Sequence, residues 1–258
     1  SNAYCIYRDR KKRLWAASMD GANLFDEGQQ KFCKIKLFKS LTIDIKEDSQ
    51  GNVWFATQGD GLWRLDKNNV WKQYKHVEND STSLVSDQVN CLAIGEKGQL
   101  YAATSEGLCE FLPSKGIFRR ISIDAPSQDF TSLVISQGVM WISTSKGIVK
   151  YTPGEPVQLF NKYDGLTCDQ FMPNAGLLAS DGRIYFGSTR GFNCFYPYLV
   201  KINQVAPPVA ITSVELFGQP IEAGSDQLEK SLSHAAELNL SHNENAINIS
   251  FAALSYVS

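Results

Sequence analysis

The chain has 258 residues, of which 43% are hydrophobic and 20% are charged, and its formal net charge is −2 at pH 7. This length allows a sizeable core in one or two domains, and the charge balance, without a basic stripe, predicts that the region binds no nucleic acid. No apolar run approaches the ~20 residues that a membrane span requires. Residues 1–3, Ser-Asn-Ala, are typical of a tag remnant and are set aside.

A sequence unit recurs five times between residues 4 and 198. Each copy has an aromatic residue, a small residue two positions later, then a hydroxyl residue and a glycine. The aromatics are spaced roughly 40 to 47 residues apart, as expected for one four-stranded propeller blade per unit. The aromatics are Trp15, Trp54, Tyr101, Trp141 and Tyr185, the hydroxyls are Ser18, Thr57, Thr104, Thr144 and Ser188, and the glycines are Gly21, Gly61, Gly107, Gly147 and Gly191.

This pattern predicts an all-β protein with five four-stranded blades that form part of a larger propeller. In the second unit the expected strands are Leu41–Glu47, Val53–Ala56, Leu62–Asp66 and Val70–Lys75. We expect the repeated hydroxyls to be buried and to bond the backbone of the following turn. Because the first unit starts abruptly at Tyr4–Arg8, we expect a blade series that does not close into a ring.

The repeat stops before a proline-punctuated linker at residues 199–208. Residues 209–258 then predict strands at Val209–Phe217, Glu237–Leu240 and Ala246–Ala252. Some fifty residues are few for a β-sandwich domain, so we expect only the first part of one.

The sequence predicts no catalytic centre in this region. His76, His234 and His242 belong to no nucleophile motif, while Glu47 and Asp48 fit turn and strand-end positions. A two-carboxylate glycosidase site stays an alternative. None of the six cysteines forms a C-x-x-C pair, so neither a metal site nor a cofactor is predicted. We expect buried free thiols, with one disulfide as the alternative in an oxidising compartment.

A binding site is the better hypothesis, and the turns suggest where it lies. The residue before each turn glycine is charged, which places Asp20, Asp60, Glu106, Lys146 and Arg190 on one predicted rim. Trp63 and Tyr163 add aromatic faces on which a sugar could stack. The alternative is that the charged residues are solvated turn positions and that Trp63 packs within its blade.

The repeats resemble the two-component regulator propeller repeats of bacterial hybrid sensors. The stretch from Ile45 to Leu62 matches the family pattern I-x-E-D-x-x-G-x-W-x-x-T-x-x-G-L nearly throughout. Residues 208–214 and 245–256 resemble the opening of the triple-tyrosine domain that follows such propellers, with Tyr256 as the one plausible signature tyrosine. The order of the two parts is more specific than either part alone.

The resemblance implies a periplasmic sensor ectodomain that detects glycan-derived oligosaccharides and signals as a homodimer. It also implies that the kinase, the membrane helix and the output domain belong to regions outside this sequence. Two other functions stay open: a scaffold that holds subunits together while ligand binds elsewhere, and a carbohydrate-active propeller enzyme.

Overall fold

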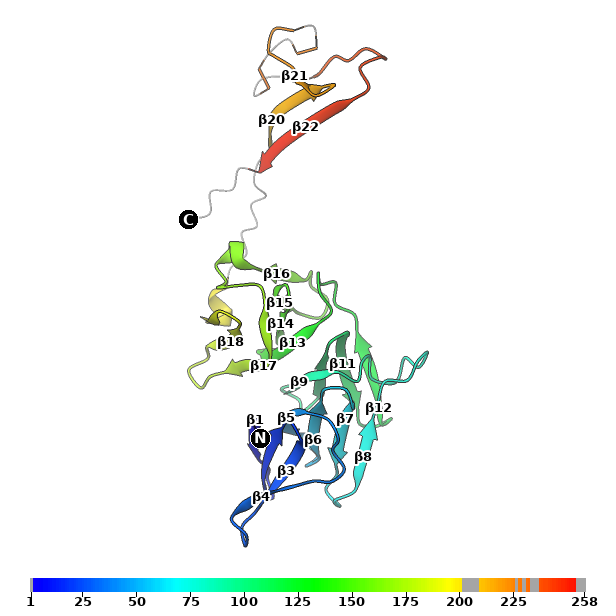
Figure 1. The fold of residues 1–258 in the computed structure, drawn as a ribbon, viewed down its shortest axis with the longest axis vertical. Helices are drawn as coiled ribbons and strands as arrows, with labels where there is room; N and C mark the ends of the chain where they lie inside the picture. Colours follow the sequence, from blue (N-terminus) through cyan, green and yellow to red (C-terminus); the bar gives the residue numbers. More distant parts are fainter. Residues whose placement is uncertain (1, 201–208, 226, 229–230, 233–236, 254–258) are drawn as a thin grey trace. The chain divides into compact units, whose positions relative to one another are not determined.

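The computed structural model describes residues 2–200, 209–225, 227–228, 231–232 and 237–253. They fall into two compact units, residues 1–200 and 201–258. The first unit is built of five antiparallel sheets that follow one another along the chain (Figure 1). The all-β fold class predicted from the repeats is therefore confirmed.

Each of the first four sheets contains four strands in chain order, joined as successive hairpins. The first sheet has β1 (Ala3–Arg8), β2 (Leu14–Ser18), β3 (Gly21–Asp26) and β4 (Lys31–Lys34), and the second has β5 (Thr42–Glu47), β6 (Val53–Thr57), β7 (Leu62–Leu65) and β8 (Trp71–Tyr74). The third has β9 (Val89–Ile94), β10 (Leu100–Thr104), β11 (Gly107–Leu112) and β12 (Ile117–Ile121), and the fourth has β13 (Phe130–Ser136), β14 (Val139–Thr144), β15 (Gly147–Tyr151) and β16 (Gln158–Phe160).

The fifth sheet differs from the predicted four-stranded unit. Within the described residues it has three strands, β17 (Phe171–Leu178), β18 (Ile184–Ser188) and β19 (Gly191–Phe195). Two short 3-10 helices flank it, η1 (Lys162–Asp164) and η2 (Pro197–Leu199). Pro197 has no backbone N–H and a fixed φ, so the chain leaves β19 in a helical turn and not in a hairpin to a fourth strand.

The repeated hydroxyl has the same structural role in all five sheets. Each hydroxyl donates to the carbonyl oxygen of the turn glycine, at 3.0 Å for Ser18, 2.6 Å for Thr57, 2.8 Å for Thr104, 2.9 Å for Thr144 and 3.1 Å for Ser188. The first four are buried and Ser188 is half-buried. The predicted backbone bonding is confirmed, and the predicted burial holds for all but the fifth copy.

The turn glycine is required by both φ and space. Gly61 has φ +72°, and a Cβ there would overlap the carbonyl oxygen of Tyr74. Gly147 has φ +117°, and a Cβ there would overlap the carbonyl oxygen of Phe160. In both cases the third strand of the sheet is pressed against its neighbour, which only glycine permits.

The core of the first unit lies between neighbouring sheets. One buried cluster joins the second and third sheets around Trp54, Tyr74, Leu92, Phe111 and Phe118. Comparable clusters join the first sheet to the second, the third to the fourth and the fourth to the fifth. Burying the faces of adjacent sheets against each other is the main stabilising contribution of such a stack.

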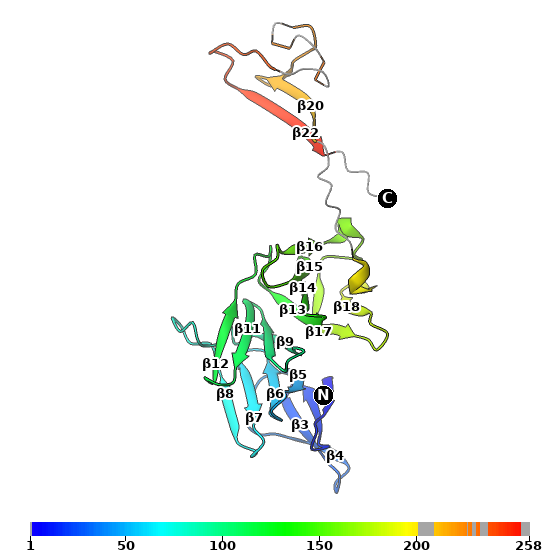
Figure 2. The same ribbon diagram turned by 180° about the vertical axis from the view of Figure 1, so that it is seen from behind.

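The innermost strands meet at the centre of the first unit. β1, β5, β9, β13 and β17 contact one another in chain order, and β17 also contacts β9 and β5. The amide of Asn174 in β17 donates a 2.9 Å hydrogen bond to the carbonyl oxygen of Ile43 in β5. Seen from either side, the sheets form an arc (Figures 1 and 2), and in the described part of the chain no strand pairing joins the first sheet to the fifth.

The second unit contains one three-stranded sheet in the order β21-β20-β22. Its strands are β20 (Val209–Leu216), β21 (Gln219–Pro220) and β22 (Ile247–Ala253), so the strands predicted near Val209 and Ala246 are confirmed. The strand predicted at Glu237–Leu240 is wrong, because these residues form a loop. Asn239 N donates to Gln227 O, and among the described residues this backbone bond does not continue into a ladder.

Two sequence predictions, the linker and the signature tyrosine, fall largely on residues that the structure does not describe. Most of the predicted linker at 199–208 and the signature position Tyr256 lie outside the described residues. All six cysteines are free thiols; Cys91 and Cys109 are buried and Cys194 is exposed. Within the described ranges, no helix combines the length and the apolar composition needed to cross a membrane.

Candidate ligand-binding site

An open pocket of about 710 Å³ lies at one end of the inner strands of the first unit. It is bordered by the second, third, fourth and fifth sheets. Its lining consists of Gln58, Gly59, Ser86, Asp87, Gln88, Asn90, Ser105, Glu106, Asp129, Thr131, Ser145, Gln170, Phe171, Pro173 and Thr189. Amide, hydroxyl and carboxylate groups therefore predominate, and Phe171 and Pro173 supply the apolar surface.

Two positions of the repeat supply most of this lining. The residue directly after the repeated hydroxyl contributes Gln58, Ser105, Ser145 and Thr189, one from each of the second to fifth units. The segment that enters the next inner strand contributes a second set, Asp87, Gln88, Asp129 and Gln170. Successive sheets thus present equivalent polar positions toward the same space, because every unit has the same fold.

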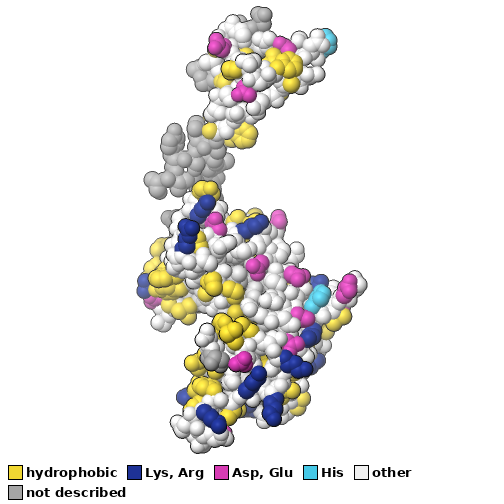
Figure 3. Space-filling model, viewed as in Figure 1, with side chains coloured by type: hydrophobic (Ala, Val, Ile, Leu, Met, Phe, Trp, Pro, Cys, Tyr) yellow, Lys and Arg dark blue, Asp and Glu magenta, His cyan; other side chains and the backbone are white. Residues whose placement is uncertain are grey.

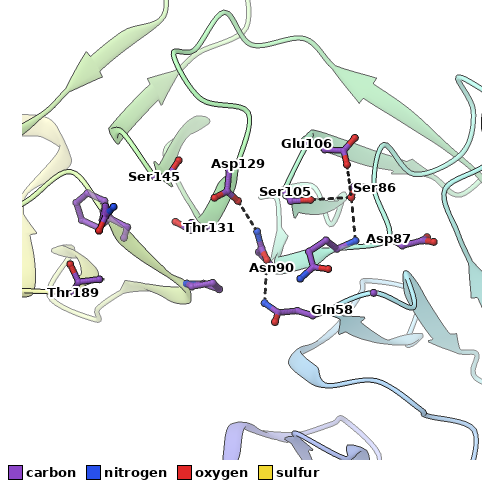
Figure 4. Close-up of a pocket in the computed structure, with 15 residues that line it drawn as sticks. Gln58, Ser86, Asp87, Asn90, Ser105, Glu106, Asp129, Thr131, Ser145 and Thr189 are labelled. Atoms are coloured by element: carbon purple, nitrogen blue, oxygen red, sulfur yellow. Dashed lines mark hydrogen bonds between the residues drawn. The ribbon is translucent and has the colours of Figure 1, made fainter.

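A chain of side-chain hydrogen bonds joins three units across the pocket (Figure 4). Gln58 Nε2 donates to Asn90 Oδ1 at 3.3 Å, and Asn90 Nδ2 donates to Asp129 Oδ1 at 3.3 Å. Asn90 Nδ2 also lies 3.1 Å from the carbonyl oxygen of Phe130. Asn90 is buried, so its amide is fixed by neighbours from both sides and in turn fixes Gln58 and Asp129.

A second set of contacts orients the small polar groups. Ser86 Oγ lies 3.0 Å from Ser105 Oγ, and the equivalent pair Ser127 and Ser145 is separated by 2.9 Å. In the fifth unit the corresponding atoms, Cys168 Sγ and Thr189 Oγ1, are 3.7 Å apart. Each contact ties a turn to the segment that leads into an inner strand, so the pocket wall is held by repeated cross-links between loops.

Three carboxylates line the pocket: Asp87, Glu106 and Asp129. Burial raises the pKa of Asp129, although the bond from Asn90 opposes the shift. His, Cys, Asp and Glu side chains of the described residues do not assemble into a group that could hold a metal ion. The arrangement supplies fixed acceptors and amide donors for a polar ligand.

The predicted charged rim is only partly brought into this site. Glu106 lines the pocket, and its Oε1 lies 3.4 Å from Ser86 Oγ. Lys146 and Arg190 are exposed on the turns that carry Ser145 and Thr189, but they are not lining residues. Asp60 is held away by a 2.8 Å ion pair with Lys75 and by a bond from Gln73. Asp20 is exposed on the first sheet, outside the pocket.

The two predicted aromatic platforms lie outside the pocket as well. The ring of Trp63 packs against Phe38 at 5.6 Å and Trp71 at 6.5 Å between centroids. That packing matches the alternative of a strand residue within the blades. Tyr163 is 87% exposed in η1, where Lys162 lies over its ring.

Most of the pocket was missed from the sequence, although a signal was present. The position after each repeated hydroxyl is polar in four units, while the first unit has Met19. Acid–amide pairs precede three inner strands, as Asp87-Gln88, Gln128-Asp129 and Asp169-Gln170. The charged residue before each turn glycine, which the sequence suggested, is a neighbouring position that is exposed to solvent in most units.

The second unit of the repeat matches a known family model. Residues 38–59 match the family model described as two component regulator propeller. These residues include most of the stretch on which the resemblance was based. The resemblance to regulator propeller repeats is therefore confirmed for the second unit.

The chain is similar to parts of two-component sensors over most of its length. It is 24% identical over 220 residues to "Histidine kinase P4" of Formosa agariphila, a match that covers 81% of this chain and 16% of that protein. It also shares its fold with the extracellular domain of a hybrid two component system from B. thetaiotaomicron, with a TM-score of 0.56 and 20% identity. That similarity covers 98% of this chain and 41% of the extracellular domain. The chain thus spans less than half of the length of either relative, 16% of the kinase and 41% of the extracellular domain.

The same architecture also occurs in an enzyme. Virginiamycin B lyase from Staphylococcus aureus has a TM-score of 0.55 with 14% identity, over 81% of this chain and 73% of the lyase. At this identity the likeness shows a shared propeller fold alone. Function must accordingly be argued from the site.

Proposed function

We propose that this chain is the ligand-sensing part of an extracytoplasmic, periplasmic region of a hybrid two-component sensor, and that its ligand is a glycan-derived oligosaccharide. The observation that carries this proposal is the polar pocket shared by four sheets. A saccharide offers many hydroxyls, and the pocket offers carboxylates, amides and hydroxyls that are fixed by mutual bonds. Fixed polar partners reduce the ordering cost of binding.

Similarity to sensor regions supports the assignment of the signal pathway. The relatives include a histidine kinase and an extracellular domain of a hybrid system. On this proposal, residues 209–258 are the first part of a triple-tyrosine domain, and the pocket's ligand state is passed through it toward a membrane. Kinase activity then belongs to another part of the full-length protein.

The pocket also suggests how ligand could change the propeller. Its walls come from four units, and the bonds from Gln58 to Asn90 and from Asn90 to Asp129 cross two of the boundaries between them. A ligand that bridges the second to the fifth unit would favour one relative arrangement of the sheets. A sensor needs such a difference in affinity between two states.

Isothermal titration calorimetry with a panel of neutral, amino and acidic oligosaccharides tests the proposal. Gln170→Ala removes an exposed polar lining group, and Ser145→Ala removes a lining hydroxyl together with its 2.9 Å contact to Ser127. Losing one hydrogen bond of about 1 kcal/mol should weaken binding roughly 5-fold. Ser114→Ala, an exposed serine in the β11–β12 turn, is the matched control and should leave affinity unchanged.

The outcomes separate the three functions. Binding that is weakened by the pocket variants supports the sensor. Absence of binding to every saccharide favours a scaffold. Release of products from a bound saccharide, abolished by Asp129→Asn or Glu106→Gln, would identify an enzyme.

A further inference from the structure

The charges that line the pocket are of one sign. Asp87, Glu106 and Asp129 are the ionisable lining residues, and the lining includes no lysine, arginine or histidine. They come from the entry to β9, the β10–β11 turn and the entry to β13. Glu106 of the third sheet and Asp129 at the entry to the fourth therefore bring negative charge to the same pocket, whereas the carboxylate of Asp87 is turned toward His76 (Figure 4).

These carboxylates are not neutralised by ion pairs. The five ion pairs of the described residues use Asp9, Asp44, Asp60, Glu110 and Asp181. Lys75 has an electrostatic interaction with Asp87, but its ammonium is paired with Asp60 at 2.8 Å. The negative charge of the pocket is thus compensated only weakly from outside.

Each lining carboxylate also keeps acceptor capacity. In the described structure Asp87 Oδ1 accepts from His76 N at 2.7 Å, Glu106 Oε1 from Ser86 Oγ at 3.4 Å and Asp129 Oδ1 from Asn90 Nδ2 at 3.3 Å. The second oxygen of each group has no such bond among the described residues. A carboxylate is an acceptor only, so these oxygens can take a hydroxyl or an ammonium but not another carboxylate.

The environment of Asp129 agrees with this polarity. Burial raises the pKa of its carboxyl group, and the group that faces it is the uncharged amide of Asn90. A positive charge next to a partly desolvated carboxylate is stabilising, whereas a second negative charge is not.

From the lining we infer that the pocket selects a saccharide without carboxylate or sulfate groups, and that it favours one carrying a protonated amine. This inference rests on the proposed function and names the class of ligand for the same site. Hydroxyls of a neutral sugar satisfy the amides and hydroxyls around Gln58, Ser105 and Ser145. An amine adds a charge-assisted bond to Glu106 or Asp129, which is stronger than a neutral bond.

Two exposed cations near the pocket provide an alternative binding surface with the opposite charge. Lys146 and Arg190 lie on neighbouring turns outside the lining. A ligand held by them, above the pocket, would be acidic. The sign of the ligand's charge therefore distinguishes binding inside the pocket from binding to the rim.

The test compares three trisaccharides of similar size by calorimetry on the full chain: a glucosamine trimer, cellotriose and a galacturonate trimer. We expect the amine to bind about 10-fold more tightly than the neutral sugar, and the acid to bind at least about 10-fold more weakly. Only the affinity for the amine should fall steeply as salt is raised.

Two nearly isosteric variants locate the effect. Glu106→Gln and Asp129→Asn should each reduce the preference for the amine severalfold while retaining affinity for cellotriose. The exposed acids Glu155 and Asp124 provide matched controls, and Glu155→Gln and Asp124→Asn should change nothing. Glu106 is itself exposed on a turn, so its variant tests the inference even if the Asp129 variant folds poorly.

Failure of the inference and failure of the proposed function look different. If the galacturonate trimer binds most tightly and Lys146→Ala or Arg190→Ala abolishes that binding, the ligand lies on the rim and the inference is overturned. If an acidic sugar and an amino sugar bind equally, the inference also fails while saccharide sensing stands. If none of the three binds, the inference is overturned, and only absence of binding to the whole calorimetric panel overturns the saccharide assignment as well.

Discussion

The indole Nε1 of Trp54 donates a 2.8 Å hydrogen bond to Asp48 Oδ2, six residues earlier in the same hairpin. The first sheet repeats this contact between Trp15 Nε1 and Asp9 Oδ2 at 2.9 Å. In the fourth sheet Ile135 stands six residues before Trp141, whose Nε1 is buried without a partner among the described residues. In the first two units the aspartate is thus a structural acceptor for the tryptophan of its own hairpin.

Replacing Asp48 by Ala should destabilise the first unit substantially. Asp48 also accepts bonds from the backbone of Gln50 and Asn52, and it is buried. Leaving several buried donors unsatisfied should cost about 2–4 kcal/mol of unfolding free energy. Urea denaturation followed by tryptophan fluorescence measures this change.

Asp66→Ala is the matched control for that substitution. Asp66 organises a comparable turn by accepting from Asn68 N and Val70 N, but it bonds no indole and its turn is exposed. The expected loss is smaller, about 1 kcal/mol. Equal losses for the two variants would contradict a special role of the aspartate–tryptophan contact.

Replacing Thr57 by Val should lower the free energy of unfolding by about 1 kcal/mol. This is the lower end of the roughly 1–3 kcal/mol expected when a buried polar group loses its hydrogen-bond partner. Valine keeps the shape of threonine but loses the 2.6 Å bond to Gly61 O. That carbonyl still accepts from Thr57 N, which limits the cost. Ser188→Ala, at the half-buried copy, should cost less, and an unchanged thermal midpoint for Thr57→Val would argue against the prediction.

The cysteines should differ sharply in reactivity. Burial, aided by the nearby Asp44 carboxylate, raises the pKa of Cys91 to about 12. The Cys91 thiol therefore stays protonated in the folded state at pH values above the ordinary thiol pKa of about 8.5. Because the unfolded chain loses this proton first, the free energy of unfolding falls as pH rises from about 8.5 toward 12. Iodoacetamide at pH 8 should modify exposed Cys194 quickly and Cys91 only after unfolding, as read by peptide mass spectrometry.

Cys194→Ser is the control, because it should remove the fast adduct without altering the slow ones. Rapid modification of Cys91 in folded protein would show that the inner strands open far more readily than their packing indicates.

Self-association is the fourth prediction, and it stems from the two end sheets of the first unit. Tyr4 and Ile6 of β1 are 46% and 63% exposed, and Leu177 of β17 and Phe192 of β19 are 59% and 63% exposed. Hydrophobic side chains gather on the side of the unit where β1 and β17 lie (Figure 3). Burying such an apolar surface between two copies stabilises the complex by roughly 25 cal/mol per Å². We therefore expect a homodimer through sheet faces or edges.

Sedimentation velocity at micromolar concentration measures this association. Ile6→Glu or Phe192→Glu should shift the chain toward the monomer, whereas Lys115→Glu in an exposed turn should not. A 28.7 kDa monomer across the concentration range would refute the prediction.

The sequence determined the repeat and therefore the fold class. Positions such as Trp54, Thr57 and Gly61 follow local rules, because a hydroxyl, a glycine and an aromatic act within one hairpin and leave the same pattern in each unit. The strand at Glu237–Leu240 was predicted wrongly, since a strand also needs a neighbouring strand to pair with.

The pocket, by contrast, was decided by the tertiary structure. Gln58, Asn90 and Asp129 are separated by dozens of residues, and their bonds exist only because the inner strands of successive sheets contact one another. The same is true of Asn174, whose bond to Ile43 joins the fifth sheet to the second. Local sequence fixes how each blade forms, but which side chains share a space depends on how the blades pack together.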